Sequence, residues 1–178
     1  EPEKGVDVAI AAVAACARPL TLVVAGREGS ATDELVAAAA ATPPEVEIRL
    51  VGAVEAVAEL LAAADVCLLA SRREGLPGVL VEALAVTTPV VAVDIPGVRE
   101  VLGDDLGVVV PPGDPAAVAA GIVSVLEGRS GWDPVVARRR FEEHFTLERV
   151  AGRTLDAYER ALTGPPLKDA IGRPTRRR

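Results

Sequence analysis

Aromatic, imidazole and methionine side chains are scarce or absent in this chain of 178 residues. Aromatic residues make up 2% of it, there is a single histidine, and methionine is missing altogether. The scarcity of aromatic rings disfavours a flavin site. No cluster of Cys and His residues has the spacing of zinc ligands. Because there is no Met and the first expected element is a helix, we expect a preceding strand, and with it a partner domain, to lie upstream of residue 1.

Cysteine is also rare, with only Cys16 and Cys67. Two cysteines do not make a disulfide framework. Both fall in apolar stretches, so we predict that they are buried free thiols and that the protein is located in the reducing cytoplasm. The lone histidine, His144, lies far along the chain from either thiol, which disfavours a catalytic cysteine.

No apolar run approaches the ~20 residues of a membrane-spanning helix. Charge is divided unevenly: residues 1–128 carry 7 basic and 19 acidic side chains, a net of −12, whereas residues 129–178 carry 12 and 7, a net of +5. An acidic body argues against nucleic acid as the partner. We interpret the basic end as a solvated helix face and a disordered tail, with peripheral contact to anionic lipid at the inner face of the membrane as the alternative. Its members are Arg138 to Arg140, Lys168, Arg173 and Arg176 to Arg178.

Half of the residues are apolar, and apolar runs alternate with segments of helical spacing. No internal repeat is visible, and we predict one domain over 1–163, followed by a basic, Pro-rich tail over 164–178. The expected strands are 20–25, 46–51, 66–70, 89–93 and 107–110. The expected helices are 5–18, 32–41 (or from residue 30), 54–63, 78–86, 97–102, 115–127, 133–143 and 146–162.

The strand segments are apolar on both faces, and a helix follows each of them. This pattern predicts an α/β fold, a doubly wound, Rossmann-like parallel sheet covered on both sides. In such sheets the ligand lies beyond the carboxyl ends of the strands. The loops 26–29, 52–54, 71–78 and 94–97 should therefore surround one crevice.

Two carboxylates, Glu74 and Glu82, flank a Gly/Pro-containing turn between a strand and a helix. Pro77 suits the first helical position, so the amides after it should converge on the crevice and hold a diphosphate. Glu82 lies about 7.5 Å along that helix, where it would accept hydrogen bonds from a ribose. Glu74 would accept them from a second sugar. Two glutamates eight apart also occur by chance in acidic chains, and the plain alternative is a solvated helix residue and a loop charge.

The stretch from Glu74 to Ala92 reads Glu-Gly-Leu-Pro, Glu-Ala-Leu-Ala after four residues, and Pro-Val-Val-Ala after three more. It resembles the nucleotide-sugar motif of glycosyltransferase family 4, whose members are retaining enzymes of the two-domain GT-B fold. Further segments match in the same order along the chain. They are 2–5 (Pro-Glu-Lys-Gly), 52–54, 60–65, 108–115 and 145–150.

The resemblance implies that the chain is the C-terminal, donor-binding half of such an enzyme. Lys4 and Glu74 would form the catalytic part, Lys4 neutralising the donor diphosphate and Glu74 holding the sugar. Glu82 would bind the ribose. No cofactor and no metal are implied, and an absent N-terminal domain would bind the acceptor. The remaining implied donor-binding residues are Gly26, Gly52, Val54, Gly75, Leu76, Pro77, Gly78 and Val79.

Several positions depart from the family pattern. Thr87 stands where a small residue, often Gly, is usual, Val54 where a basic residue is frequent, and Pro96-Gly97 where Gly-Gly is common. An arginine that often precedes the lysine of the first loop would lie upstream of residue 1. These departures place donor affinity and base identity in doubt while leaving the fold prediction intact.

Three functions are weighed against one another. The first is sugar transfer from a nucleoside diphosphate donor, such as a UDP or GDP sugar, to an acceptor hydroxyl. The second is a degenerate transferase that serves as a binding or scaffold module. The third, a flavodoxin-like or receiver domain, is disfavoured by the few aromatics and by the lack of an early acidic cluster. The other polar or aromatic candidates are expected to be solvated or structural: Arg72, Arg73, Arg99, Asp65, Trp132, Tyr158 and His144.

Overall fold

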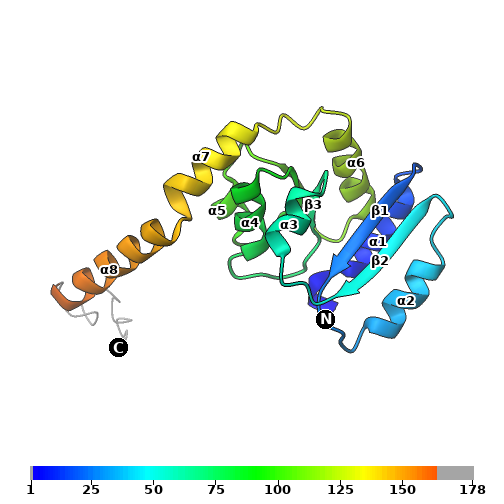
Figure 1. The fold of residues 1–178 in the computed structure, drawn as a ribbon, viewed down its shortest axis with the longest axis horizontal. Helices are drawn as coiled ribbons and strands as arrows, with labels where there is room; N and C mark the ends of the chain where they lie inside the picture. The colour runs from blue at the N-terminus through cyan, green and yellow to red at the C-terminus, as the bar shows by residue number, and fades with distance from the viewer. Residues whose placement is uncertain (1, 164–178) are drawn as a thin grey trace, which may run out of the picture. The chain divides into compact units, whose positions relative to one another are not determined.

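The structure, a computed structural model, describes residues 2–163 (Figure 1). It divides into two compact units between Phe141 and Glu142, and each is described by itself. The expected tail over 164–178 lies outside the described residues, and the 1–163 domain stays a prediction.

A 3₁₀ turn, η1 (Pro2–Lys4), comes first. The strands are β1 (Leu20–Ala25), β2 (Val46–Gly52), β3 (Cys67–Leu69), β4 (Val90–Val93) and β5 (Val108–Val110), and the helices are α1 (Val6–Ala15), α2 (Thr32–Ala40), α3 (Val57–Ala62), α4 (Gly78–Val86), α5 (Val98–Leu102), α6 (Pro115–Leu126), α7 (Pro134–His144) and α8 (Leu147–Thr163).

Each predicted helix and strand is present, with ends that differ by at most three residues. Helix ends fray, so differences of this size are ordinary. One difference concerns the motif itself, because Pro77 precedes α4 instead of forming its first residue. Its φ of −73° and ψ of 98° are extended, and its carbonyl accepts the Leu80 N–H at 3.1 Å. The helix therefore begins at Gly78.

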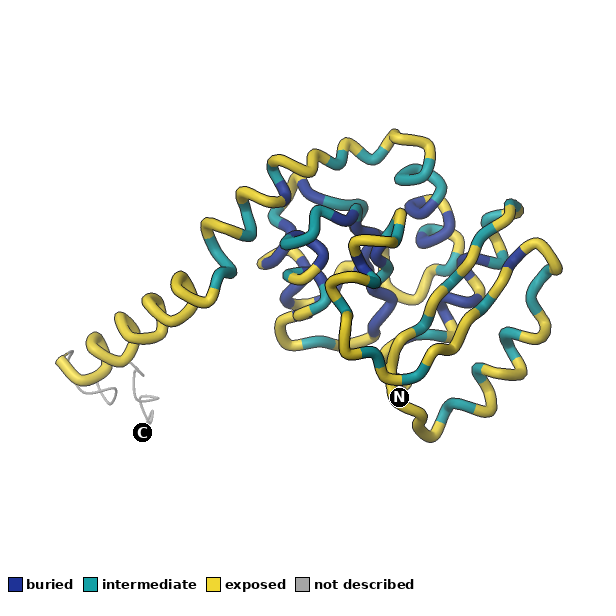
Figure 2. The backbone as a smooth tube through the Cα atoms, viewed as in Figure 1, coloured by how far each residue is buried: buried dark blue, intermediate teal, exposed yellow. Residues whose placement is uncertain are grey.

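All strand pairing is parallel, which confirms the α/β prediction. The strands form two sheets, β1–β2 and β3–β4–β5, where one continuous sheet was expected. Among the described strands, β1 and β3 each pair along one edge only. A second difference concerns burial: no residue of β1 is buried, although its segment was expected to be covered on both faces (Figure 2). Val23, for example, is 37% exposed. The expected strand upstream of residue 1 stays a prediction.

The core lies around β4, whose four residues are at most 1% exposed. Helix α6 packs against β4 and β5, and it also contacts α1. Helix α4 packs against β3 and buries Leu80 and Leu84 completely. These contacts fix the start of α4 beside the carboxyl end of β3, where the sequence placed its ligand crevice.

The two thiols differ in their surroundings. Cys67 in β3 is buried, and this burial, followed by the nearby charge of Glu82, raises the pKa of its thiol to about 12. The prediction of a buried free thiol is confirmed for Cys67. Cys16, which follows the last residue of α1, is also a free thiol, but it is partly exposed, so the prediction of burial is wrong there. Its thiol donates to the Ala12 carbonyl at 3.3 Å.

Helix α4 ends at Thr87, which adopts a left-handed conformation with φ 62° and ψ 25°. Left-handed residues commonly end helices, and glycine is favoured there because a Cβ makes this conformation costly. The indole Nε1 of Trp132 donates to the Thr87 carbonyl at 3.2 Å, so Trp132 has the structural role that was expected. The unusual Thr87 is thus accommodated by the backbone at a cost in strain.

We predict that Thr87→Gly stabilises the protein by up to about 1 kcal/mol, because glycine adopts the left-handed conformation without that cost. The free energy of unfolding in urea measures the effect. The matched control is Ala85→Gly in the last turn of α4, where the helical conformation is retained, and this variant should destabilise by up to about 1 kcal/mol. A loss of stability in Thr87→Gly as large as that of the control would contradict the prediction.

Candidate functional site

The loop that carries Glu74 joins β3 to α4. The Glu74 side chain is 17% exposed, and two groups donate hydrogen bonds to the same carboxylate oxygen, Oε1. Lys4 Nζ, from the turn before α1, lies 2.9 Å from Oε1, and the hydroxyl of Ser71 lies 2.8 Å from it. Two of the residues singled out from the sequence, 70 positions apart, are therefore in direct contact.

These contacts keep Glu74 ionised. Partial burial is the largest single influence and raises the pKa of the carboxyl group. The hydrogen bonds from Lys4 and Ser71, together with the positive charge of Lys4, outweigh it, so that the pKa lies below its usual value of 4.5. An ionised carboxylate can only accept hydrogen bonds, which suits it to ligands that bear hydroxyl groups.

Two glycines fix the backbone of this loop by lying against it. At Gly5, where φ is 63°, an added Cβ would lie 2.0 Å from the Ala70 carbonyl oxygen. At Gly97, where φ is 87°, it would lie 2.2 Å from the Gly75 carbonyl oxygen. Both distances are far shorter than any real contact of a Cβ atom. Only glycine lets the start of α1 and the start of α5 approach the loop so closely.

Two arginines near the loop, Arg72 and Arg99, are each paired with a carboxylate, although about half of each side chain is exposed to solvent. The Arg73 side chain is 80% exposed, so it is solvated, as was expected. Arg72 makes two hydrogen bonds to the Asp7 carboxylate, at 2.9 and 2.6 Å, and its backbone N–H donates to the Glu3 carbonyl at 2.7 Å. Arg99 is paired with Asp94 in the same manner. Their role is structural, and Arg72 ties the loop to α1.

The backbone between Glu74 and α4 presents N–H groups that have no acceptor within residues 2–163. They belong to Gly75, Leu76, Gly78 and Val79, and the first three of these residues are exposed. Amides at the start of a helix bind anions because the N–H groups and the helix dipole both favour negative charge. Pro77 is buried between them and has no N–H to donate. The loop can therefore hold an anionic group beside an acceptor of hydroxyl hydrogens.

The other predicted site residues are not joined to this loop. Glu82 is exposed on α4, and no hydrogen bond or ion pair links it to Glu74 in the described part of the chain. The N–H of Gly26 donates to the Gly52 carbonyl at 2.8 Å, which brings the ends of β1 and β2 together. Val54 follows them and is partly buried. The described contacts leave the donor-binding roles of these four residues as predictions.

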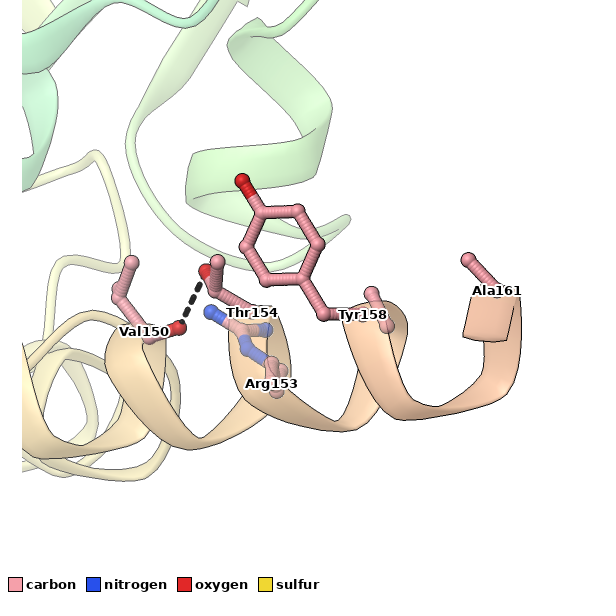
Figure 3. Close-up of a pocket in the computed structure, with 6 residues that line it drawn as sticks. Val150, Arg153, Thr154, Tyr158 and Ala161 are labelled. Atoms are coloured by element: carbon pink, nitrogen blue, oxygen red, sulfur yellow. Dashed lines mark hydrogen bonds between the residues drawn. The ribbon is translucent and has the colours of Figure 1, made fainter. Parts of the chain in front are cut away.

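A surface hollow of about 510 Å³ lies in the second unit, along one face of α8 (Figure 3). It contains no residue that the sequence singled out for the site, and its walls lack a carboxylate. Within it, the Thr154 hydroxyl donates to the Val150 carbonyl of its own helix. We therefore place the candidate site at the Glu74 loop. The hollow is lined by Val150, Arg153, Thr154, Ala157, Tyr158 and Ala161.

Sequence reasoning missed two contributors to the site, Ser71 and Asp7. Ser71 was within the stretch that drew attention, and its place just after a buried strand was a usable signal. Asp7 carried no such signal, because its pairing with Arg72 depends on the tertiary structure.

Among residues 2–163, no three His, Cys, Asp or Glu side chains are grouped so as to hold a metal ion. Nor does any helix there combine the length and the apolar character needed to cross a bilayer.

The fold resembles several solved structures. The structure of Anabaena Alr3699/HepE in complex with UDP-glucose superposes with a TM-score of 0.80 at 22% identity, covering 89% of this chain and 46% of that one. A sucrose-phosphate synthase from Thermosynechococcus elongatus gives a TM-score of 0.75 at 26% identity, over 93% of this chain and 44% of that one. These likenesses confirm the prediction of a GT-B type α/β fold.

Curated relatives agree with the structural comparison. The chain is 35% identical over 177 residues to a glycogen synthase of Mycobacterium tuberculosis, covering 92% of this chain and 41% of that enzyme. It is 38% identical over 133 residues to a phosphatidyl-myo-inositol mannosyltransferase of Mycobacterium leprae, covering 71% and 34%. The chain thus spans less than half the length of these relatives. Residues 1–144 match the family described as Glycosyl transferases group 1, and the chain belongs to that family.

Proposed function

We propose that this chain is the donor-binding half of a retaining glycosyltransferase of family 4, which transfers a sugar from a nucleoside diphosphate sugar to an acceptor hydroxyl. The observation that carries the proposal is the contact between Lys4 and Glu74 beside the unpaired N–H groups of Gly75, Leu76, Gly78 and Val79. This places a cation, a carboxylate and helix-start N–H groups around one loop. A nucleotide sugar needs these three groups, since it joins an anionic diphosphate to a polyhydroxyl ring.

Each part of the donor has a matching group in this proposal. The amides of Gly75 to Val79 and the ammonium of Lys4 bind the diphosphate, and Lys4 supplies positive charge that a metal ion provides in other enzymes. When the sugar leaves, negative charge grows on the diphosphate, and preorganised donors stabilise it. Glu74 accepts hydrogen bonds from the sugar hydroxyls, and Glu82 from the ribose. Gly26, Gly52 and Val54 lie beside the nucleobase of the donor in this proposal.

Lys4 is paired with Glu74 in the ligand-free protein and is half exposed, with 51% of its side chain accessible. An ammonium group has three donor hydrogens on a flexible stem, so it can contact a phosphate oxygen and the carboxylate together or turn from one to the other. Exposed pairs of this kind contribute only about 0–1 kcal/mol to stability. The small gain means that the pair opens readily for a donor.

The names of the relatives support sugar transfer as the reaction class. The matched enzymes are a glycogen synthase and a mannosyltransferase, and a protein with a similar fold is known in complex with UDP-glucose. Retention of configuration, operation without a metal and a cytoplasmic location are parts of this proposal. Because the relatives are more than twice as long as this chain, we propose that acceptor binding belongs to an N-terminal domain outside it and that the chain by itself is inactive.

We predict that UDP, GDP or ADP, or one of their sugar conjugates, raises the thermal unfolding midpoint of this chain. A ligand at a hundredfold its dissociation constant adds ~2.7 kcal/mol to the stability of the folded state. Glu82→Ala should reduce the gain, because the variant lacks the proposed ribose contact. The matched control is Glu59→Ala, which removes an exposed acid from α3 and should leave the gain unchanged. A chain that none of these ligands stabilises would instead favour the scaffold alternative.

We also predict that affinity for the sugar part of the donor is lost as the pH falls through the lowered pKa of Glu74. The free carboxyl value is 4.5 and the pKa in the folded protein is below it. Because the pKa of Glu74 is lower in the folded protein, the stabilising contribution of its ionised carboxylate is complete above pH 4.5. It is lost as the pH falls through the pKa of the folded protein. Lys4→Met should raise the pKa of Glu74 and start the loss at higher pH.

Calorimetry with UDP-glucose between about pH 7 and pH 3 measures this loss, with UDP alone as the reference for the nucleotide. Lys4→Arg serves as the control because it keeps the positive charge. Equal pH profiles for the wild type and Lys4→Met would show that the ion pair does not set the ionisation of Glu74.

A further inference from the structure

The two hydrogen bonds to Glu74 end on one oxygen. Both Lys4 Nζ and Ser71 Oγ donate to Oε1, and within residues 2–163 no donor reaches Oε2. We propose that Ser71 is a positioning residue: its buried hydroxyl holds Oε1 of Glu74 so that Oε2 remains to accept hydrogen bonds from hydroxyl groups of the donor sugar. This inference rests on the proposed function, and it adds a residue that the family resemblance did not assign.

Burial of Ser71 makes its hydroxyl a fixed donor. The residue is 3% exposed, so bulk water has little access to it, and a serine hydroxyl has a single hydrogen to donate. In the structure that hydrogen bond goes to Glu74 at 2.8 Å. Leaving a buried hydroxyl without an acceptor is unfavourable, so the orientation of Ser71 and that of the carboxylate depend on each other.

The backbone on each side of Ser71 is held in place. Before it, the Ala70 carbonyl lies against Gly5, where no Cβ would fit. After it, the Arg72 N–H donates to the Glu3 carbonyl, and the Arg72 guanidinium binds Asp7. Rotation about its own side-chain bond is therefore the main freedom left to the hydroxyl. A group supported in this way can set the direction of a carboxylate.

The arrangement selects a chemical class for the ligand group at Oε2. An ionised carboxylate oxygen accepts hydrogen bonds and repels other anions, so Oε2 suits neutral sugar hydroxyls and disfavours a phosphorylated or acidic sugar. The role of Ser71 also grows when the donor binds. If Lys4 turns toward the diphosphate, the Ser71 hydroxyl remains as the protein donor that holds Oε1.

Ser71→Ala tests this role, with Thr88→Val as the matched control. Thr88 is also 3% exposed, but its hydroxyl donates to the Leu61 carbonyl at 2.7 Å in the core. The pKa of Glu74 is measured by NMR titration, and the affinities for UDP and UDP-glucose are measured by calorimetry. The pairs GDP with GDP-mannose and ADP with ADP-glucose are tested in the same way, and the pair that binds most tightly is used.

For Ser71→Ala we expect a higher pKa of Glu74 and about fivefold weaker binding of the nucleotide sugar, which corresponds to one lost hydrogen bond. Binding of the nucleoside diphosphate alone should change by less than about twofold, because the phosphate contacts remain. Thr88→Val should lower the unfolding temperature and leave all three quantities unchanged. A residue that merely supports the fold would instead affect both ligands together.

An unchanged pKa of Glu74 in Ser71→Ala, or an equal loss of affinity for both ligands, overturns the positioning role. If wild-type protein binds none of the six ligands, the proposed function itself fails, and the inference falls with it. Wild-type binding that Ser71→Ala leaves intact overturns the inference alone. Should Ser71→Ala not fold, Ser71→Cys replaces it under the same criteria, since its thiol is of similar size and a weaker donor.

Discussion

The contact between the turn before α1 and the loop after β3 organises the rest of this site. Lys4 and Ser71 meet at Glu74, the Arg72 N–H bonds to the Glu3 carbonyl, and the Ala70 carbonyl packs against Gly5. None of these contacts is strong by itself, since several of the charged groups are about half exposed. Their effect is on geometry: together they hold a carboxylate, a cation and a set of free amides around one loop.

The packing beneath the loop determines where those groups lie. Helix α4 buries Leu80 and Leu84 against the core, which fixes the direction of its first amides. Gly97, at the start of α5, lies against the Gly75 carbonyl, near the end of the loop, whereas Gly5 lies against the Ala70 carbonyl, just before the loop. The left-handed Thr87 ends α4 with some strain, and Trp132 bonds to its carbonyl. An apolar core thus carries a polar loop.

Much of the fold was predictable because strand and helix signals in this chain are local. Apolar runs bounded by Gly, Pro or polar residues marked β1 to β5, and the Pro77 turn marked the start of α4 to within one residue. The division into two sheets was not predictable, since periodicity within a segment carries no information about which edges pair. The prediction that Cys16 is buried was wrong for a related reason, because the depth at which the end of a helix is buried depends on tertiary packing.

For the site, the sequence by itself determined which loop would carry the chemistry: parallel strands place their following loops at one edge, so Glu74 was expected at the crevice. Lys4 was added to it by the family resemblance. Only the tertiary structure decided that these two residues touch, that Ser71 shares the same carboxylate oxygen, and that Arg72 is bound to Asp7. Residues about 65 to 70 positions apart in the chain approach within hydrogen-bonding distance only after β3 and α1 have packed. Hydrogen bonds are set by distances of a few tenths of an ångström, which no pattern of residue types contains.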